Sequence, residues 1–220
     1  MINNFRKEIK IPINKTLDLF FNNWKDQSKN FKRTYEDRSV RSIYYDTPNF
    51  RSAKDNLSGI SVRKKYRIRW YNDENNLNYE IKIKKNNLGS KILYTSKNSF
   101  KNFKKLFSLK NLTHENNISI LENVDSFNLE PKLKVSYTRS YYSYNNLIRI
   151  TYDRNINYEK FDYFNIREKK IFDQMNVIEI KFDPKNLDIA TELIQNSNFI
   201  PKRFSKYLRG LYLFGNTVYI

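Results

Sequence analysis

Charged and apolar residues alternate along several short segments of this chain. In residues 66–70, for example, Arg67 and Arg69 occupy alternate positions between aromatic and apolar neighbours. Because successive side chains of a β-strand point to opposite faces of a sheet, such a segment forms a strand with one charged and one apolar face. The same alternation occurs in residues 6–10, 79–84 and 177–182. The pattern therefore predicts a sheet that carries much of its charge on one face.

Apolar runs that end at turn-forming residues predict further strands. Residues 42–45 stop at Asp46-Thr47-Pro48, and Tyr144-Asn145-Asn146 is expected to form the turn of a hairpin. The polar residues 72–76 are expected to form another turn. The predicted strands are residues 5–11, 42–45, 60–71, 77–84, 133–143, 147–153 and 176–182.

Apolar residues at helical spacing indicate helices that cover the apolar face of this sheet. The helices are predicted over residues 16–29, 96–107 and 186–196 and in the segment after Phe204. Thr16 is the expected N-cap of the first helix and Trp24 a core residue, while Gly210 is expected to weaken the last helix. The inward-facing residues are expected to be Leu17, Phe20, Phe21 and Trp24 in the first helix, Phe100, Phe103, Leu106 and Phe107 in the second, and Leu187, Ala190 and Ile194 in the third.

The order of these elements favours one α+β domain over residues 1–220, because no long linker, low-complexity block or repeat interrupts the chain. Many strands joined by short turns, with three or four helices, are typical of an antiparallel sheet or β-barrel. No segment approaches the roughly 20 apolar residues of a spanning helix, and residues 1–8 lack the apolar core of a signal peptide. We therefore expect a cytoplasmic protein, and association with the inner face of a membrane through a separate partner stays open.

Composition narrows the classes of partner and of catalytic site. The chain has 41 Lys and Arg against 23 Asp and Glu, a formal net charge of +18. This excess favours an anionic partner such as nucleic acid, a phospholipid surface or a phosphate-rich small molecule. The absence of cysteine excludes disulfides, thiolate zinc sites and cysteine nucleophiles. The single histidine, His114, lies in a polar stretch and is expected to be a solvated loop residue without a catalytic role.

Carboxylates recur within the basic strands, and this changes the interpretation of the charge. A surface that only tracks nucleic acid gains nothing from carboxylates, whereas a carboxylate can hold a divalent cation against a phosphate. The charged faces are therefore predicted to bind a polyanion with a hard metal ion such as Mn²⁺ or Mg²⁺. The four carboxylates are Glu8, Glu80, Asp153 and Glu179. Arg67, Arg69, Arg139 and Arg149 are expected to orient phosphates, and Lys10, Lys82, Lys91 and Lys206 to neutralise them.

Two other interpretations stay open from the residues alone. Each charged strand can be the solvated face of a half-buried sheet, although neighbouring like charges repel and such a face normally mixes signs. The protein can also be a general nucleic-acid binder that stacks bases on its abundant aromatic residues. Tyr44, Tyr45, Tyr66 and Tyr79 argue against stacking, because tyrosines at such strand positions more often pack against neighbours.

Eight segments together resemble a known family. They are residues 6–10, 42–46, 67–71, 80–82, 137–139, 149–153, 178–181 and 204–207. Their order is similar to that in the VTC domain, the polyphosphate polymerase module of the vacuolar transporter chaperone complex. That domain is a member of the triphosphate tunnel metalloenzymes, or CYTH-like superfamily. The resemblance covers nearly the whole chain.

The resemblance implies a β-barrel tunnel with a basic lumen, in which the γ-phosphoryl group of ATP is added to a growing inorganic polyphosphate chain with a divalent metal, Mn²⁺ or Mg²⁺. Catalytic phosphate contacts are implied for Lys10, Arg67, Arg69, Lys82, Arg139 and Lys206. Substrate contacts are expected from Arg6, Lys91, Tyr137, Arg149, Lys181 and Ser205. Glu179 matches the metal-binding glutamate of the family, and Glu8 is expected to bind the metal with it.

One departure separates this chain from the hydrolytic members of the superfamily. Those triphosphatases usually carry a Glu-x-Glu-x-Lys strand, and here Arg6 occupies the first glutamate position, followed by Glu8 and Lys10. The loss of a carboxylate that serves metal binding and water activation favours the polymerase. A metal-dependent triphosphatase of the same fold and a non-catalytic, polyphosphate-binding accessory subunit stay open as alternatives.

Overall fold

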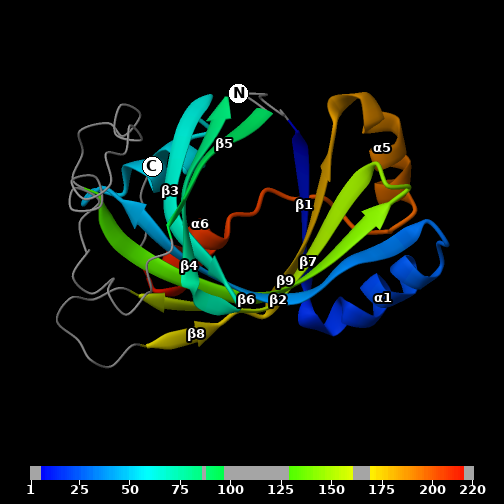
Figure 1. The fold of residues 1–220 in the computed structure, drawn as a ribbon, viewed down its shortest axis with the longest axis horizontal. Helices are drawn as coiled ribbons and strands as arrows, with labels where there is room; N and C mark the ends of the chain where they lie inside the picture. Colours follow the sequence, from blue (N-terminus) through cyan, green and yellow to red (C-terminus); the bar gives the residue numbers. More distant parts are fainter. Residues whose placement is uncertain (1–5, 86–87, 97–128, 161–168, 216–220) are drawn as a thin grey trace.

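A computed structural model of the chain describes residues 6–85, 88–96, 129–160 and 169–215 (Figure 1). The four described α-helices are α1 (Asp18–Asp26), α2 (Arg51–Leu57), α5 (Leu187–Gln195) and α6 (Lys206–Leu213). Short 3₁₀ turns at Lys15–Leu17 and Pro184–Asn186 precede α1 and α5. The strands are β1 (Lys7–Asn14), β2 (Phe31–Asp46), β3 (Val62–Tyr71), β4 (Asp73–Lys85), β5 (Leu88–Ser96), β6 (Glu130–Tyr144), β7 (Ile148–Lys160), β8 (Lys170–Phe172) and β9 (Met175–Phe182).

The strands form one antiparallel sheet in the order β1-β9-β7-β6-β2-β3-β4-β5, and β8 adds to β7. The sheet curls until its two edge strands approach each other (Figure 1). Among the described residues, a single backbone bridge between Arg6 and Gly89 joins these edges. The predicted α+β fold on an antiparallel sheet is therefore confirmed, as a strongly curved and incompletely closed barrel.

The apolar face of the sheet lies outside the barrel on the side covered by α1 and α5 (Figure 1). There Phe21 and Trp24 of α1 and Ala190 and Leu193 of α5 pack against isoleucines of β1, β7 and β9. The same strands place their charged residues on the opposite face, because Lys10 pairs in register with Glu179 and each lies between two isoleucines that pack in the core. The alternation in the sequence thus separates the hydrophobic core from a charged interior.

Helix α6 packs against the start of β6 and the end of β7. A Cβ atom added at Gly210 would lie 2.4 Å from Leu133 and 2.5 Å from Tyr158, both of which are fully buried. Glycine at this position therefore allows the close approach of α6 to the barrel. Asp46 at the end of β2 connects α2 and α6, because its carboxylate accepts hydrogen bonds from backbone N–H groups in the first turn of α2 and from the Tyr207 hydroxyl of α6.

Several predicted boundaries are wrong. Strand β2 begins eleven residues before the predicted 42–45, strand β5 was not predicted, and the expected turn 72–76 is reduced to Asn72, a left-handed residue between β3 and β4. Long-range pairing overrides local turn preference in these segments. The hairpin through Asn145 and Asn146 is confirmed, with both residues in the left-handed conformation that such turns require.

The first helix is shorter than predicted and begins differently. Asn14, rather than Thr16, caps the 3₁₀ turn that leads into α1. Trp24 is a core residue as expected, but the predicted inward residues Leu17 and Phe20 are exposed. In α5, Ala190 is buried and Ile194 packs against the core, as predicted, whereas Leu187 is exposed and Leu193 is buried without having been predicted. Most of the predicted helix 96–107 and His114 lie outside the described residues.

No helix among residues 6–85, 88–96, 129–160 and 169–215 is both long and apolar enough to cross a membrane.

Candidate functional site

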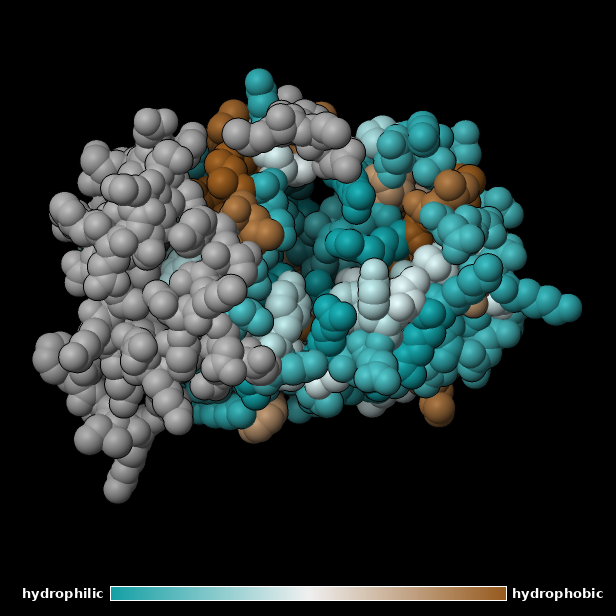
Figure 2. Space-filling view, in the orientation of Figure 1, coloured by the Kyte–Doolittle hydropathy of each residue, from teal (hydrophilic) through white to brown (hydrophobic). Residues whose placement is uncertain are grey.

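The interior of the barrel is a hydrophilic hollow (Figure 2). The register of the sheet and the alternation of side chains place charged residues from seven strands on this inner face, and α6 adds one more. The basic residues are Lys10, Lys65, Arg67, Arg69, Lys82, Lys91, Arg139, Lys181 and Lys206. The carboxylates among them are Glu8, Glu80, Asp153 and Glu179. The cations outnumber the carboxylates, so the described interior carries excess positive charge.

Glu179 on β9 is the carboxylate with the most cationic neighbours in this interior. Its oxygens lie 2.8 Å from Lys181, 3.4 Å from both Lys206 and Arg139, and 3.6 Å from Lys10. Burial alone would raise the pKa of Glu179, but these four cations hold it well below its usual range. Glu179 is therefore an ionised carboxylate at neutral pH, on the strand that lies between β1 and β7.

Glu8 on β1 lies beside Glu179 and shares two of its cations. Its carboxylate is 3.0 Å from Lys82, 3.2 Å from Lys10 and 3.7 Å from Lys181. Burial and the charge of Glu179 act to raise the pKa of Glu8, and the three lysines outweigh them and lower it. Two ionised carboxylates are thus held close together, although they repel, because lysines lie between them.

Arg139 on β6 forms a deeply buried ion pair in the interior. Its guanidinium donates two hydrogen bonds to the fully buried Asp153 of β7, at 2.5 and 2.7 Å. Lys206, at the start of α6, contacts the same carboxylate at 2.5 Å. Since the register places Arg139 directly opposite Asp153, the hairpin of β6 and β7 builds this pair from neighbouring positions.

The arginines of β3 bind mostly neutral groups. Arg69 donates to the Ser42 hydroxyl at 2.9 Å and to the Tyr137 hydroxyl at 3.1 Å. Arg67 donates to the Tyr44 hydroxyl at 3.2 Å and pairs with the buried Glu80. This wall of the barrel therefore has fewer carboxylates per cation than the wall formed by β6, β7 and β9.

Two lysines on this side have depressed pKa values. Burial, together with the charges of Lys10 and Lys181, lowers the pKa of Lys82 to about 8 despite its contact with Glu8. Burial lowers the pKa of Lys65 well below its usual range, and Lys10 and Lys82 lower it further. Because the charged form of these two lysines is disfavoured, a nearby anion would stabilise that form and raise the pKa of the lysine.

The structure brings most of the predicted site residues together, and two lie at its margin. Tyr137 binds Arg69, Lys91 contacts Glu80, and Ser205 caps α6. The contacts described above connect the others, which are Lys10, Arg67, Arg69, Lys82, Arg139, Lys181, Lys206, Glu8 and Glu179. Arg149 is exposed but pairs in register with Lys181, on the same face. Arg6 is exposed at the bridge between β1 and β5.

Three residues of the interior are not among the predicted site residues. Lys65 donates to Ser205 at 3.0 Å, and its position two residues before Arg67 is the signal that could have revealed it. Tyr44, which binds Arg67, was interpreted as a packing residue. Thr151 pairs in register with Glu179, and its buried hydroxyl has no hydrogen-bond partner among the described residues. No sequence pattern marks such a threonine.

The interior fits a divalent metal that takes part of its ligands from the substrate. Glu8 and Glu179 supply ionised oxygen ligands, and the unpaired Thr151 hydroxyl lies beside Glu179. The described residues contain no cluster of three or more carboxylate, histidine or cysteine ligands. Mg²⁺-like ions are usually bound by one or two carboxylates together with water and substrate phosphates, which matches this donor set.

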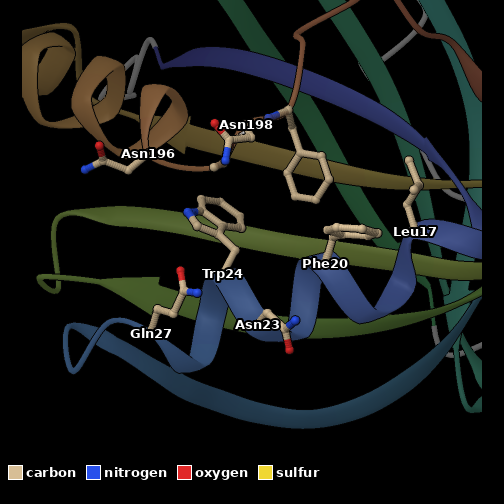
Figure 3. Close-up of a pocket in the computed structure, with 9 residues that line it drawn as sticks. Leu17, Phe20, Asn23, Trp24, Gln27, Asn196 and Asn198 are labelled. Carbon is tan, nitrogen blue, oxygen red and sulfur yellow. Dashed lines mark hydrogen bonds between the residues drawn. The ribbon is translucent and has the colours of Figure 1, made fainter.

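A second cavity lies outside the barrel and has a different character. It is a pocket of about 490 Å³ between α1 and the segment after α5, lined by Leu17, Phe20, Asn23, Trp24, Gln27, Asn196, Ser197, Asn198 and Phe199 (Figure 3). None of these residues is charged. The pocket therefore cannot neutralise a polyanion, and we place the candidate site inside the barrel.

Known structures share this fold. An adenylate cyclase-like protein from Vibrio parahaemolyticus matches with a TM-score of 0.55 and 17% identity, over 96% of this chain and 99% of that one. The adenylyl cyclase-like protein HpAC1 from Hippeastrum, described as having a dominant triphosphatase activity, matches with a TM-score of 0.56 and 10% identity, over 96% and 95%. At these identities the likeness shows the fold alone.

The comparison with curated proteins found no match. The family model of the VTC domain matches residues 3–214, which is nearly the whole chain and includes every strand and helix of the barrel. The chain therefore belongs to the VTC domain family.

Proposed function

We propose that this protein is a metal-dependent polyphosphate polymerase that transfers the γ-phosphoryl group of ATP to the end of an inorganic polyphosphate chain. The observation that carries the proposal is the excess of buried cations around the pair of ionised glutamates Glu8 and Glu179. A purely structural ion-pair network would balance its charges, because unpaired buried charge is costly. The excess positive charge is complementary to a chain of phosphates.

Phosphoryl transfer needs positioning and charge compensation more than covalent chemistry from the protein. An oxygen of the terminal phosphate of the polymer attacks the γ-phosphorus, the bond to the bridging β–γ oxygen breaks, and ADP leaves. The fixed guanidinium groups of Arg67, Arg69 and Arg139 would orient the phosphate oxygens, and Lys10, Lys82 and Lys206 would compensate the charge that develops on them. No Ser–His or Cys–His nucleophile is required.

The preorganisation of these cations supports a catalytic role. Arg139 is held by Asp153, Arg67 by Glu80 and Lys206 by its place at the start of α6, so their geometry does not depend on the substrate. When bound, Mn²⁺ or Mg²⁺ at Glu8 and Glu179 would neutralise phosphate oxygens. The remaining phosphates along the barrel would be contacted by Lys91, Lys181, Tyr137, Ser205, Arg149 and Arg6.

A metal-dependent triphosphatase is the second candidate, favoured by the triphosphatase activity described for the Hippeastrum protein of the same fold. Hydrolysis requires an activated water. Arg6 places a cation where the hydrolytic members usually have a carboxylate, which counts against water activation. A non-catalytic polyphosphate-binding subunit is the third candidate. In that case its partner would be a separate membrane protein.

The test is to incubate the purified chain with ATP and Mn²⁺ and to resolve the products by a phosphate-stained gel and by release of free phosphate. A ladder of polyphosphate with ADP supports the polymerase. Free phosphate without polymer would transfer the assignment to the triphosphatase, and tight polyphosphate binding with neither product to the accessory subunit. The matched control is Glu179→Gln, which keeps the shape of the side chain and should abolish metal-dependent turnover.

A further inference from the structure

An arginine between two tyrosines lies at one end of the charged interior. Tyr35 of β2 pairs in register with Tyr141 of β6, and their rings meet edge to face with centroids 5.7 Å apart. The guanidinium carbon of Arg38 lies 5.3 Å from the centroid of Tyr35 and 5.7 Å from that of Tyr141. We call these three residues the aromatic rim.

An irregularity in β2 creates the aromatic rim. Tyr35 and Arg38 are three residues apart, which on a regular strand would place them on opposite faces. The pairing of β2 with β6 shifts its register between these two residues, so that both side chains reach Tyr141. Bulges that redirect a side chain in this way are often found at barrel rims and beside active sites.

The aromatic rim continues the candidate site. Arg38 pairs in register with Arg139, and Tyr141 pairs with Thr151, which in turn pairs with Glu179. Burial raises the pKa of the Tyr141 hydroxyl, and the charges of Arg139 and Arg38 both act on it. Tyr141 is two residues from Arg139 on the same strand, a separation of roughly 7 Å.

The aromatic rim lies far from the point at which the middle of α6 packs on the barrel. Helix α6 packs on Leu133, eight residues before Tyr141 on β6, a distance of roughly 26 Å along the strand. The rim is open to solvent, since Tyr35 is 57% exposed. Among the residues whose side chains are described, no carboxylate forms a salt bridge with Arg38, because the adjacent Asp37 is bound by Arg33 and Arg154.

We propose that Tyr35, Arg38 and Tyr141 form a stacking surface for the base of the nucleotide substrate, whose phosphates extend inward to Arg139 and Glu179. This inference rests on the proposed function, because it assumes that a nucleoside triphosphate enters the barrel. Aromatic rings and arginine planes stack on any nucleobase through its π-face. The surface therefore adds to the binding affinity for a nucleoside triphosphate and not to that for inorganic polyphosphate, which has no base.

The test compares the binding of ATP and of inorganic tripolyphosphate to the full chain by calorimetry. Tyr35→Ala should weaken ATP binding roughly tenfold, the loss typical of one base–aromatic contact, and leave tripolyphosphate binding unchanged. Tyr35→Phe keeps the ring and should bind ATP as the wild type does. Because Tyr35 is exposed, its truncation should not unfold the barrel, and circular dichroism checks this.

A matched control separates stacking from the mere loss of an exposed tyrosine. Tyr212 is 67% exposed and lies beside an arginine, with the guanidinium carbon of Arg209 5.9 Å from its ring centroid, but it belongs to α6 and not to a strand of the barrel. Tyr212→Ala should leave the binding of both ligands unchanged.

The outcomes distinguish this inference from the proposed function. Equal losses for ATP and tripolyphosphate in Tyr35→Ala, or no loss for either, would overturn the stacking surface while the polymerase assignment still stands on product analysis. A loss confined to ATP in a protein that forms no polyphosphate would support the stacking surface and remove the polymerase. If the wild type binds neither ligand, both proposals fail.

Discussion

Two walls of the barrel interior differ in how their cations are paired. On the wall of β6, β7 and β9, Arg139 and Lys206 bind the carboxylates Asp153 and Glu179. On the wall of β3, Arg69 binds the hydroxyl groups of Ser42 and Tyr137, and Lys65 binds the hydroxyl of Ser205. The first wall is close to charge balance, and the second has an excess of positive charge that a polyanion would satisfy.

Basic residues at equivalent strand positions of the two walls therefore have different roles. A cation that neutralises a buried carboxylate contributes to folding, since its removal leaves an uncompensated charge. A cation that faces hydroxyl groups and other cations contributes little to folding and much to anion binding. Substitutions on the two walls should therefore differ in their effects on stability and on turnover.

The largest effect is expected from Arg139→Ala on the balanced wall. Turnover should fall about 10²- to 10³-fold, because a fixed contact to the transferring phosphate is lost. The free energy of unfolding should also fall by about 3 kcal/mol, because Asp153 is left with a single cationic partner. Urea unfolding and initial rates measure the two effects. Arg139→Lys, which retains the charge, should recover most of the stability but little of the rate.

Arg69→Ala on the β3 wall should lower turnover by a similar factor with little loss of stability. Its partners Ser42 and Tyr137 are neutral, and removal of Arg69 relieves repulsion from Arg67. We expect the free energy of unfolding to change by less than about 1.5 kcal/mol, the range for loss of ordinary hydrogen bonds. A stability loss as large as that of Arg139→Ala would show that the two walls do not differ.

Gly210→Ala tests the close packing of α6, the helix that begins with Lys206 of the balanced wall. The added methyl group would meet the buried side chains of Leu133 and Tyr158, so we expect a loss of about 1–3 kcal/mol in the free energy of unfolding, as for overpacking. Gly215→Ala is a control with no atom within 4 Å of the new methyl group, although its left-handed backbone adds a smaller strain. Unfolding curves that coincide with the wild type for Gly210→Ala would contradict the close packing of α6.

The smallest effect is a pH dependence of anion binding that arises at Lys82. With a pKa of about 8 in the free protein, Lys82 is charged below this pH and loses its proton above it. A bound phosphate favours the charged form and raises this pKa, so binding takes up protons near pH 8 and affinity falls by up to about tenfold per pH unit above it.

Calorimetry of tripolyphosphate binding in two buffers of different ionisation enthalpy measures this proton uptake. Lys82→Arg, whose charge persists at these pH values, should reduce the uptake at pH 8 to that of the remaining groups, chiefly Lys65. The same heat in both buffers for the wild type would show that Lys82 is already charged before the anion binds.

The sequence was sufficient for much of the site because strand alternation is a local property. Arg67 and Arg69, or Glu179 and Lys181, share a face once their segment is a strand, whatever that strand pairs with. Lys65 belonged to the same pattern and was missed because it falls in the basic run Arg63-Lys64-Lys65, in which no apolar residue separates the charges. The residues at which strands begin and end were less predictable, and β5 was not predicted.

Strand alternation was enough to predict that several basic strands with recurring carboxylates form a charged face, and helical spacing that helices cover the apolar one. Which cation pairs with which carboxylate depends on the folded barrel. Glu8 and Lys82 are 74 residues apart, and Lys206 reaches Glu179 across 27. Such contacts depend on the curl of the sheet and on the register of strands that are not neighbours in sequence. The physical reason is that alternation acts within a few residues, whereas ion pairing in a barrel acts between its opposite walls.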